Sequence, residues 1–255
     1  MIRPKKHLGQ HFLHDENIAR KIIGYLPAEA VNILEIGPGT GILTKYLLNN
    51  KNLNSFFLEI DPESVSFLNQ TYPEISDRLI KADILHYDLS LIPAPFTMIG
   101  NFPYNISTQI LFKVIEYRMI IPEVIGMFQK EVAERVASPP GSKKYGILSV
   151  LLQAYYNIDY LFTVSETVFH PPPKVQSGVI RLRKNNIEKL DCNEDLFFRV
   201  VKTAFNQRRK TLRNALKSLG MARPGTVSHL LDKRAEQLSV ADFVSLTNAI
   251  MVDRV

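Results

Sequence analysis

Three alternating glycines stand between an apolar run and a helical pattern near the start of the chain. They are Gly37, Gly39 and Gly41, in the segment EIGPGTGILT. Glycines at such a point let the backbone turn sharply and approach a ligand where side chains would clash. The spacing is G-x-G-x-G, not the G-x-G-x-x-G of dinucleotide-binding loops, and Glu35 stands just ahead of it. A carboxylate there suits the sulfonium and amino group of S-adenosylmethionine (SAM) better than a pyrophosphate. The loop therefore predicts a SAM site that includes Glu35 and the three glycines.

Two further acids are expected at the ends of the next two strands. Glu59 ends a strand about 20 residues beyond the glycine loop, where an acid typically accepts hydrogen bonds from a ribose diol. Asp83 ends the following strand and is placed to accept from the amine of the cofactor's adenine. Ligands of open α/β sheets bind at the carboxyl ends of the strands. Both acids are therefore expected to bind the cofactor.

The fourth expected strand ends in Asn101, Phe102, Pro103 and Tyr104. An adenine N6 amine is a weak nucleophile because its lone pair is delocalised into the ring. The Asn101 side-chain oxygen and the Phe102 backbone carbonyl can accept hydrogen bonds from its two hydrogens. Pro103 stiffens the turn, and Tyr104 offers a face on which an extruded base can stack. Proximity and acceptor placement would then supply most of the catalysis, so the motif predicts methyl transfer to an exocyclic amine.

A basic segment lies near the C-terminus, with no acidic residue between Leu196 and Leu231. Apolar residues at helical spacing predict two amphipathic helices, over 195–205 and 208–219. A solvated helix face normally mixes charges of both signs, whereas a one-signed face suits phosphates. The basic residues of the second helix are therefore expected to contact RNA: Arg208, Arg209, Lys210, Arg213 and Lys217.

The composition restricts the other classes of function. The net charge of +6 favours an anionic partner, and a single cysteine, Cys192, allows no internal disulfide and fits the cytoplasm. The first residues lack the apolar core of a signal peptide, and polar residues interrupt the most apolar stretch, 147–164, so no membrane span is expected. No cysteine or carboxylate cluster accompanies the N-terminal histidines, so no metal site is expected. A monomer is the default expectation.

The pattern of apolar runs predicts an α/β fold. Five β-rich runs alternate with helical patterns, and two further runs follow, over 31–37, 54–61, 78–84, 96–101, 123–129, 158–164 and 175–183. Such alternation is typical of a doubly wound, Rossmann-like sheet, here with seven mostly parallel strands. After Lys184 the strand signals end and amphipathic helices follow. We expect a SAM-binding catalytic domain over 1–185 and a small all-α RNA-binding domain over 186–255.

With these motifs in place, the chain closely resembles the KsgA (RsmA) family of small-subunit ribosomal RNA adenine N6-dimethyltransferases over nearly its whole length. The matching segments include KKHLGQHFL, NFPYNIST, VFHPPPKVQSGVIRL and FNQRRKTLRNAL, and the most diagnostic parts are GQHFL and QRRKTLRN. The resemblance implies that His11 and Leu13 help to close the cofactor pocket and that Phe169 is a second aromatic wall opposite Tyr104. Family members often have asparagine where His11 stands, but a contact through its backbone would survive.

The resemblance also implies a substrate and a cellular setting. Family members dimethylate two adjacent adenosines in a hairpin loop near the 3′ end of 16S rRNA, on an immature small ribosomal subunit. The expected role is therefore rRNA processing during ribosome biogenesis in the cytoplasm.

Two other functions stay open at this point. Large-subunit rRNA adenine methyltransferases of the macrolide-resistance type share the glycine loop and an asparagine–aromatic motif, although QRRKTLRN and VFHPPPKV argue against that reading. A non-catalytic RNA-binding assembly factor is the other, and it would not need an intact SAM site. SAM binding and the choice of RNA substrate would separate the three.

Overall fold

The computed structural model describes residues 2–220 and 224–251. The chain divides into two compact units, one of residues 1–134 and 158–184 and the other of residues 135–157 and 185–255. The second unit resumes at residue 185, where the sequence pattern changes. Residues 135–157, however, were expected within the first domain and belong instead to the helical unit. They contain α6 (Ile147–Gln153), which is buried at five consecutive positions, and a helix buried on all sides needs other helices around it.

The first unit contains a sheet of seven strands in the order β4-β3-β2-β5-β6-β9-β7, as expected in number and type. The strands are β2 (Asn32–Ile36), β3 (Asn54–Glu59), β4 (Leu79–Lys81), β5 (Phe96–Asn101), β6 (Glu123–Gln129), β7 (Tyr156–Val164) and β9 (Ser177–Lys184). The first five pair in parallel, and β9 pairs antiparallel to β6. The expected apolar runs therefore correspond to the observed strands.

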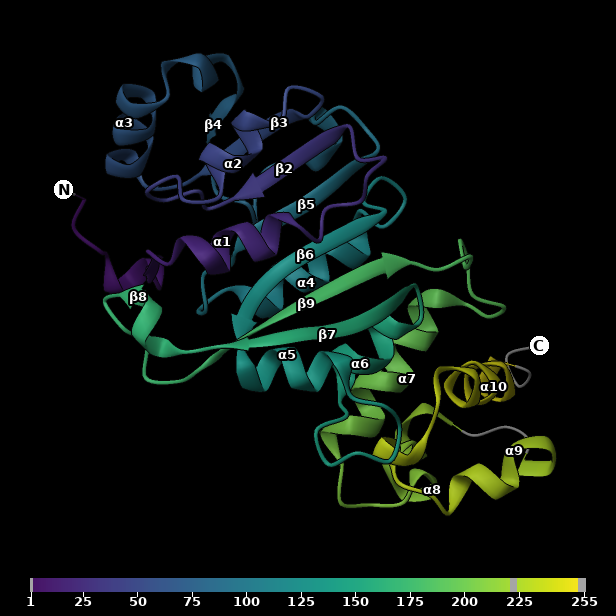
Figure 1. Ribbon diagram of the computed structural model, residues 1–255. Helices are drawn as coiled ribbons and strands as arrows, with labels where there is room; N and C mark the ends of the chain where they lie inside the picture. The colour runs from purple at the N-terminus through teal and green to yellow at the C-terminus, as the bar shows by residue number, and fades with distance from the viewer. Residues whose placement is uncertain (1, 221–223, 252–255) are drawn as a thin grey trace. The chain divides into compact units, whose positions relative to one another are not determined.

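Four helices of this unit connect and cover the strands: α1 (Glu16–Ile23), α2 (Thr44–Asn49), α3 (Pro62–Thr71) and α4 (Ser107–Glu116). In Figure 1, α1 crosses in front of the sheet and α4 lies behind it. Strands covered on both faces must be apolar throughout, and β5 is buried from Phe96 to Gly100. Because β2, β3 and β5 run in the same direction, their carboxyl ends meet at one edge of the sheet.

A second, two-stranded sheet was not foreseen from the sequence. It joins β1 (Phe12–Leu13) to β8 (Phe169–His170) in antiparallel register, with Leu13 opposite Phe169. The His14 N–H extends the pairing by donating to the Val168 carbonyl at 3.0 Å. The segments KKHLGQHFL and VFHPPPKV, which are more than 150 residues apart in the sequence, are therefore direct neighbours.

The second unit is helical. Besides α6 it contains α7 (Glu194–Asn206), α8 (Leu212–Ala215), α9 (Pro224–Leu231) and α10 (Val240–Met251), while α5 (Lys130–Ala137) spans the division of the chain. The apolar stripe of α7 is buried as expected, at Phe197, Val200, Val201 and Ala204. The prediction of one helix over 208–219 was wrong. Thr211 has an extended backbone, so α8 begins only at Leu212, and a 3₁₀ turn over Lys217–Leu219 follows it.

Candidate active site

A pocket opens where β2, β3 and β5 end, within the first unit. Its wall consists of residues 8–12, 36, 37, 39, 58–60, 82–85 and 101–106. Nine of the predicted site residues are in this wall: His11, Gly37, Gly39, Glu59, Asp83, Asn101, Phe102, Pro103 and Tyr104. The structure therefore brings the cofactor motifs and the expected methyl-acceptor motif to one cavity, as the common direction of the strands requires.

The glycine loop has the backbone that the sequence predicted. Gly37, Gly39 and Gly41 have φ angles of 64°, 57° and 79°, a region that other residues rarely adopt. A Cβ on Gly37 would meet nothing closer than Pro103 Cδ at 4.0 Å, so the loop leaves open space on its pocket side. A Cβ on Gly41 would lie 2.6 Å from the ring of Tyr72, so this glycine is needed for packing, and it does not line the pocket.

Glu59 is held in place by two backbone N–H groups. Its carboxylate accepts from Gly39 N–H at 3.0 Å and from Asp61 N–H at 2.9 Å. Burial raises the pKa of Glu59, and these two hydrogen bonds oppose that rise. Each carboxylate oxygen has a second lone pair, so the group can still accept hydrogen bonds from the two hydroxyls of a ribose.

Asp83 lies two residues beyond the end of β4, in the pocket wall. Its carboxylate accepts from Leu85 N–H at 2.9 Å and contacts His86 Nδ1 at 3.0 Å. A fixed carboxylate at this position can accept a hydrogen bond from an adenine amine.

Glu35 and Leu13 line a smaller hollow beside the main pocket. Glu35 is fully buried and accepts a hydrogen bond from Thr44 Oγ1 at 2.7 Å. Burial raises the pKa of Glu35 to about 8, against the effect of the Thr44 bond. At neutral pH this side chain is therefore largely protonated, and its bond to Thr44 ties the end of β2 to the start of α2 rather than reaching the main pocket.

Asn101 is the polar side chain at the end of β5. Its Nδ2 donates to the backbone carbonyl of His11 at 2.8 Å, which leaves the amide oxygen Oδ1 as the acceptor of the group. The backbone N–H of Phe102 donates to the Met127 carbonyl at 3.1 Å, which fixes the turn after the strand. The Phe102 ring is buried and packs on Phe128, with ring centroids 4.9 Å apart.

Tyr104 has a different aromatic neighbour from the one expected. The ring of His11 stacks on it at a centroid distance of 5.4 Å, and its hydroxyl shares a hydrogen bond with Ser177 Oγ. Burial raises the pKa of the Tyr104 hydroxyl, so it is neutral at physiological pH. Phe169 does not line the pocket; it is 2% exposed and belongs to an apolar cluster with Leu13, Ile99 and Met127.

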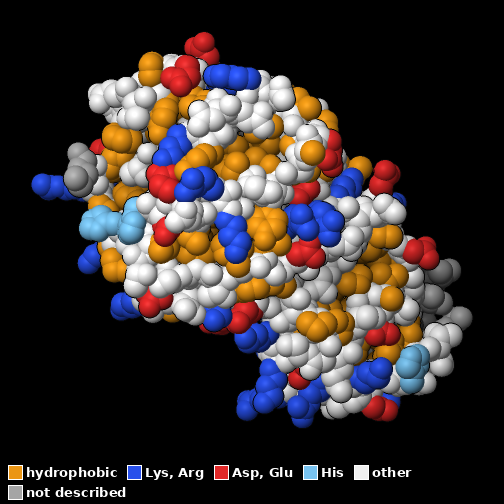
Figure 2. All heavy atoms as spheres, viewed as in Figure 1, with side chains coloured by type: hydrophobic (Ala, Val, Ile, Leu, Met, Phe, Trp, Pro, Cys, Tyr) orange, Lys and Arg blue, Asp and Glu red, His pale blue; other side chains and the backbone are white. Residues whose placement is uncertain are grey.

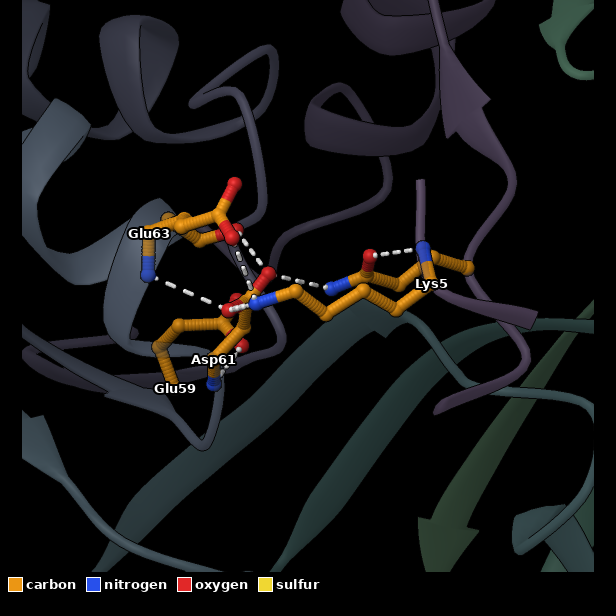
Figure 3. Close-up of polar contacts among 6 residues, drawn as sticks. Lys5, Glu59, Asp61 and Glu63 are labelled. Carbon is orange, nitrogen blue, oxygen red and sulfur yellow. Dashed lines mark hydrogen bonds and ion pairs between the residues drawn. The ribbon is translucent and has the colours of Figure 1, made fainter. Parts of the chain in front are cut away.

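The sequence reading missed how the N-terminal segment is anchored. Lys5 Nζ and Gln10 Nε2 both donate to the carboxylate of Asp61, just after β3, at 2.5 and 3.0 Å. Figure 3 shows the Lys5 side chain extended to Asp61 and Glu63, with Glu59 beside them. The motif KKHLGQ contained these donors, but its partner lies 51 residues or more away in the chain.

The expected RNA-contacting residues lie in the second unit and are all exposed. Acidic side chains that are distant in sequence partly neutralise them. Arg213 pairs with Asp232 at 2.9 Å, and Arg208 lies 3.7 Å from Glu236 and donates to the Lys143 carbonyl. Figure 2 shows Lys and Arg side chains gathered at the lower edge of this unit, with acidic side chains beside them. Arg209, Lys210 and Lys217 remain as exposed cations without a described partner of opposite charge.

Two features are absent from residues 2–220 and 224–251. Within that part of the chain, no group of three or more His, Cys, Asp or Glu side chains is arranged to hold a metal ion. In the same residues no helix is both long and apolar enough to cross a bilayer.

Comparison with known proteins gives a consistent result. The model of the family described as ribosomal RNA adenine dimethylase matches residues 1–251. Ribosomal RNA small subunit methyltransferase A of Cytophaga hutchinsonii is 56% identical over 252 residues, which cover 98% of each chain. The protein of the same name from Flavobacterium johnsoniae is 54% identical and covers 100% of this chain and 98% of its own.

A solved structure supports the same family as the family model and the two relatives. The crystal structure of a dimethyladenosine transferase from Plasmodium falciparum has a TM-score of 0.77 and 26% identity, covering 92% of this chain and 96% of its own. The pocket, its motifs and these similarities over the whole length lead to one assignment: the chain belongs to the ribosomal RNA adenine dimethylase family of SAM-dependent methyltransferases.

Proposed function

We propose that this protein dimethylates the N6 amines of two adjacent adenosines in the 3′-terminal hairpin loop of small-subunit (16S) rRNA, during ribosome biogenesis. The observation that carries the proposal is the position of Asn101, whose amide is fixed in the wall of the pocket that also contains the glycine loop and Glu59. The relatives from Cytophaga hutchinsonii and Flavobacterium johnsoniae carry the name of a small-subunit enzyme, which supports this choice of RNA.

The cofactor residues differ in the part of SAM that each would contact. Glu59 would accept from the ribose hydroxyls and Asp83 from the adenine amine. Gly37 leaves room for the methionine part, and Gly39 lies beside it in the pocket wall. His11 would contribute through its backbone, and Leu13, Glu35 and Gly41 would support the loop from the adjoining hollow and from packing. When bound, SAM supplies an electrophilic methyl group on its sulfonium.

The remaining residues act on the methyl acceptor. Asn101 Oδ1 and the Phe102 carbonyl would accept hydrogen bonds from the adenosine amine and hold its lone pair toward the cofactor side of the pocket. Pro103 stiffens this turn, and the stacked rings of Tyr104 and His11 offer aromatic surface to an extruded base. No strong general base is required, because the alkylated nitrogen loses its proton readily.

The substrate would be an immature small subunit in the cytoplasm, bound by a monomer. The exposed cations Arg209, Lys210 and Lys217 support an RNA contact by the second unit, with Arg208 and Arg213 less available because of their acidic neighbours. These contacts supply affinity and register, while the pocket selects the base.

The experiment uses the purified protein and ribosomal RNA from a strain that lacks the two dimethyladenosines. Small subunits, large subunits and free RNA are each incubated with labelled SAM, and the RNA is digested and analysed by mass spectrometry. We expect dimethyladenosine in small-subunit rRNA at two adjacent positions. Label in large-subunit RNA alone would indicate the macrolide-resistance type of enzyme, and SAM binding without any transfer would indicate an assembly factor.

A further inference from the structure

The N-terminal segment 5–13 forms one wall of the pocket and is tethered at two ends. At its C-terminal end, β1 pairs with β8, and His11 Nδ1 contacts the Pro171 carbonyl at 2.7 Å. At its start Lys5 is bound to Asp61, and Gln10, which directly precedes His11, is bound to the same carboxylate. Lys5 also orders the segment internally, since its N–H donates to Gln10 Oε1 at 2.8 Å.

Asp61 is a buried carboxylate with several donors around it. Its side chain is 0% exposed and accepts from Lys5 Nζ, Gln10 Nε2, Glu63 N–H and Ser64 Oγ, the last two at 3.1 and 3.3 Å. Burial raises the pKa of the Asp61 carboxyl, but the bonds from Gln10 and Lys5 outweigh burial and lower it overall. Asp61 is therefore charged, and it does not line the pocket.

The anchored segment touches both groups of the proposed acceptor site. The His11 carbonyl accepts the hydrogen bond from Asn101 Nδ2, and the His11 ring stacks on Tyr104. Because an amide rotates about its Cβ–Cγ bond unless it is held, the position of the His11 carbonyl determines where Asn101 Oδ1 lies.

We propose that Asp61 is a positioning residue for methyl transfer: through Lys5 and Gln10 it anchors the N-terminal segment, and the anchored segment orients the amide of Asn101. This inference rests on the proposed function, since it assumes that Asn101 Oδ1 accepts from the adenosine amine. Figure 3 shows the arrangement that carries it, with Lys5 reaching from the N-terminal segment to the two acids at the start of α3.

Asp61 also caps α3, and the two roles must be separated. Its Oδ1 accepts from Glu63 N–H at the first turn of that helix. Asparagine caps helices about as well as aspartate, so Asp61→Asn keeps the cap but loses the charge and one acceptor oxygen of the anchor. Lys5→Ala removes the charged donor of the anchor, keeps the Gln10 bond to Asp61, and leaves the cap of α3 in place.

The test compares Asp61→Asn and Lys5→Ala with Lys6→Ala, which removes the same charge one residue later on an exposed side chain. Lys5→Arg is the conservative rescue variant. We measure amide hydrogen exchange of the peptide spanning residues 5–14 without RNA, the melting temperature, and kcat and KM for small-subunit methylation.

We expect exchange of the segment to accelerate, and kcat to fall, by about tenfold or more in Asp61→Asn and Lys5→Ala, because a charge-assisted anchor is lost. In these two variants KM for RNA and the melting temperature should change little. Lys6→Ala should match the wild type in all measurements. Lys5→Arg should keep most of the wild-type kcat that Lys5→Ala loses. Unchanged exchange and kcat in Lys5→Ala, or equal losses in Lys6→Ala, would overturn the proposal. If Asp61→Asn fails to fold, Lys5→Ala alone decides.

The design separates this inference from the proposed function. An inactive wild type whose segment still exchanges faster in Lys5→Ala would refute the function while confirming the anchor. An active wild type with wild-type kcat in both anchor variants would refute the positioning role alone.

Discussion

The side-chain amide of Asn101 donates to the backbone carbonyl of His11, a residue 90 positions earlier in the chain, at 2.8 Å. The bond joins the end of β5 to the N-terminal wall of the pocket. It uses the amide nitrogen and leaves the oxygen as acceptor, which is the polarity needed to bind an amine hydrogen. It also uses only the backbone of His11, so a change of side chain at this position does not remove the contact.

Asn101→Ala should bind SAM nearly as well as the wild type and lose methyl transfer. Removal of one oriented hydrogen-bonding group in an active site lowers kcat by about 100-fold or more. Calorimetry with SAM and a methylation assay measure the two properties, and retained SAM binding is the control for a correctly folded pocket. An active Asn101→Ala variant would exclude Asn101 from the mechanism.

Tyr104 should act through its ring. Tyr104→Phe loses only the hydroxyl contact with Ser177 and should keep most of the activity. Tyr104→Ala loses the stacking surface, which is worth about 1–3 kcal/mol per base, so kcat/KM should fall by about 5- to 150-fold. A larger loss in Tyr104→Phe than in Tyr104→Ala would contradict this role.

Phe169→Ala should act on stability more than on chemistry. The side chain is 2% exposed within an apolar cluster, and such a truncation costs about 3–5 kcal/mol of the free energy of unfolding. Denaturant unfolding measures this cost, and kcat at low temperature measures the site. A variant of normal stability without activity would instead support Phe169 as a wall of the base pocket.

The exposed cations of the second unit should differ in their contribution to RNA binding. Replacing Arg209, Lys210 and Lys217 by Ala should make the negative slope of log affinity against log salt shallower by about 2 to 3. Each phosphate contact contributes about 0.7–0.9 to the magnitude of this slope. Arg213→Ala should change it less, because Asp232 already pairs with Arg213. Binding titrations at several salt concentrations test both, and an unchanged slope in the triple variant would place the RNA surface elsewhere.

Glu35 should make stability depend on pH. Its pKa is raised by burial from 4.5 to about 8, so between these values the folded state holds a proton that the unfolded state has lost. The free energy of unfolding should therefore fall as pH rises through this window, by at most about 1.4 kcal/mol per unit. Glu35→Gln keeps an acceptor for Thr44 and should flatten the profile. Equal slopes for the two proteins in denaturant unfolding from pH 5 to 8 would refute the assignment.

Local patterns in the sequence determined the sheet and the residues at its edge. Apolar runs predict strands because a strand covered on both faces is mostly apolar, and each of the seven runs overlaps a strand, although β7 is only partly buried. Glycines with positive φ, Glu59 and Asn101 then reach one pocket because parallel strands end on the same side.

Only the tertiary structure decided how distant segments constrain those residues. Asp232 and Glu236 fold back on a basic segment that contains no acid of its own, and Thr211 interrupts the helix expected there. Asp61 meets Lys5, and the His11 carbonyl meets Asn101, across separations of 56 and 90 residues. Periodicity and spacing describe neighbours along the chain, whereas ion pairs and amide orientation depend on contacts that exist only after the chain has folded.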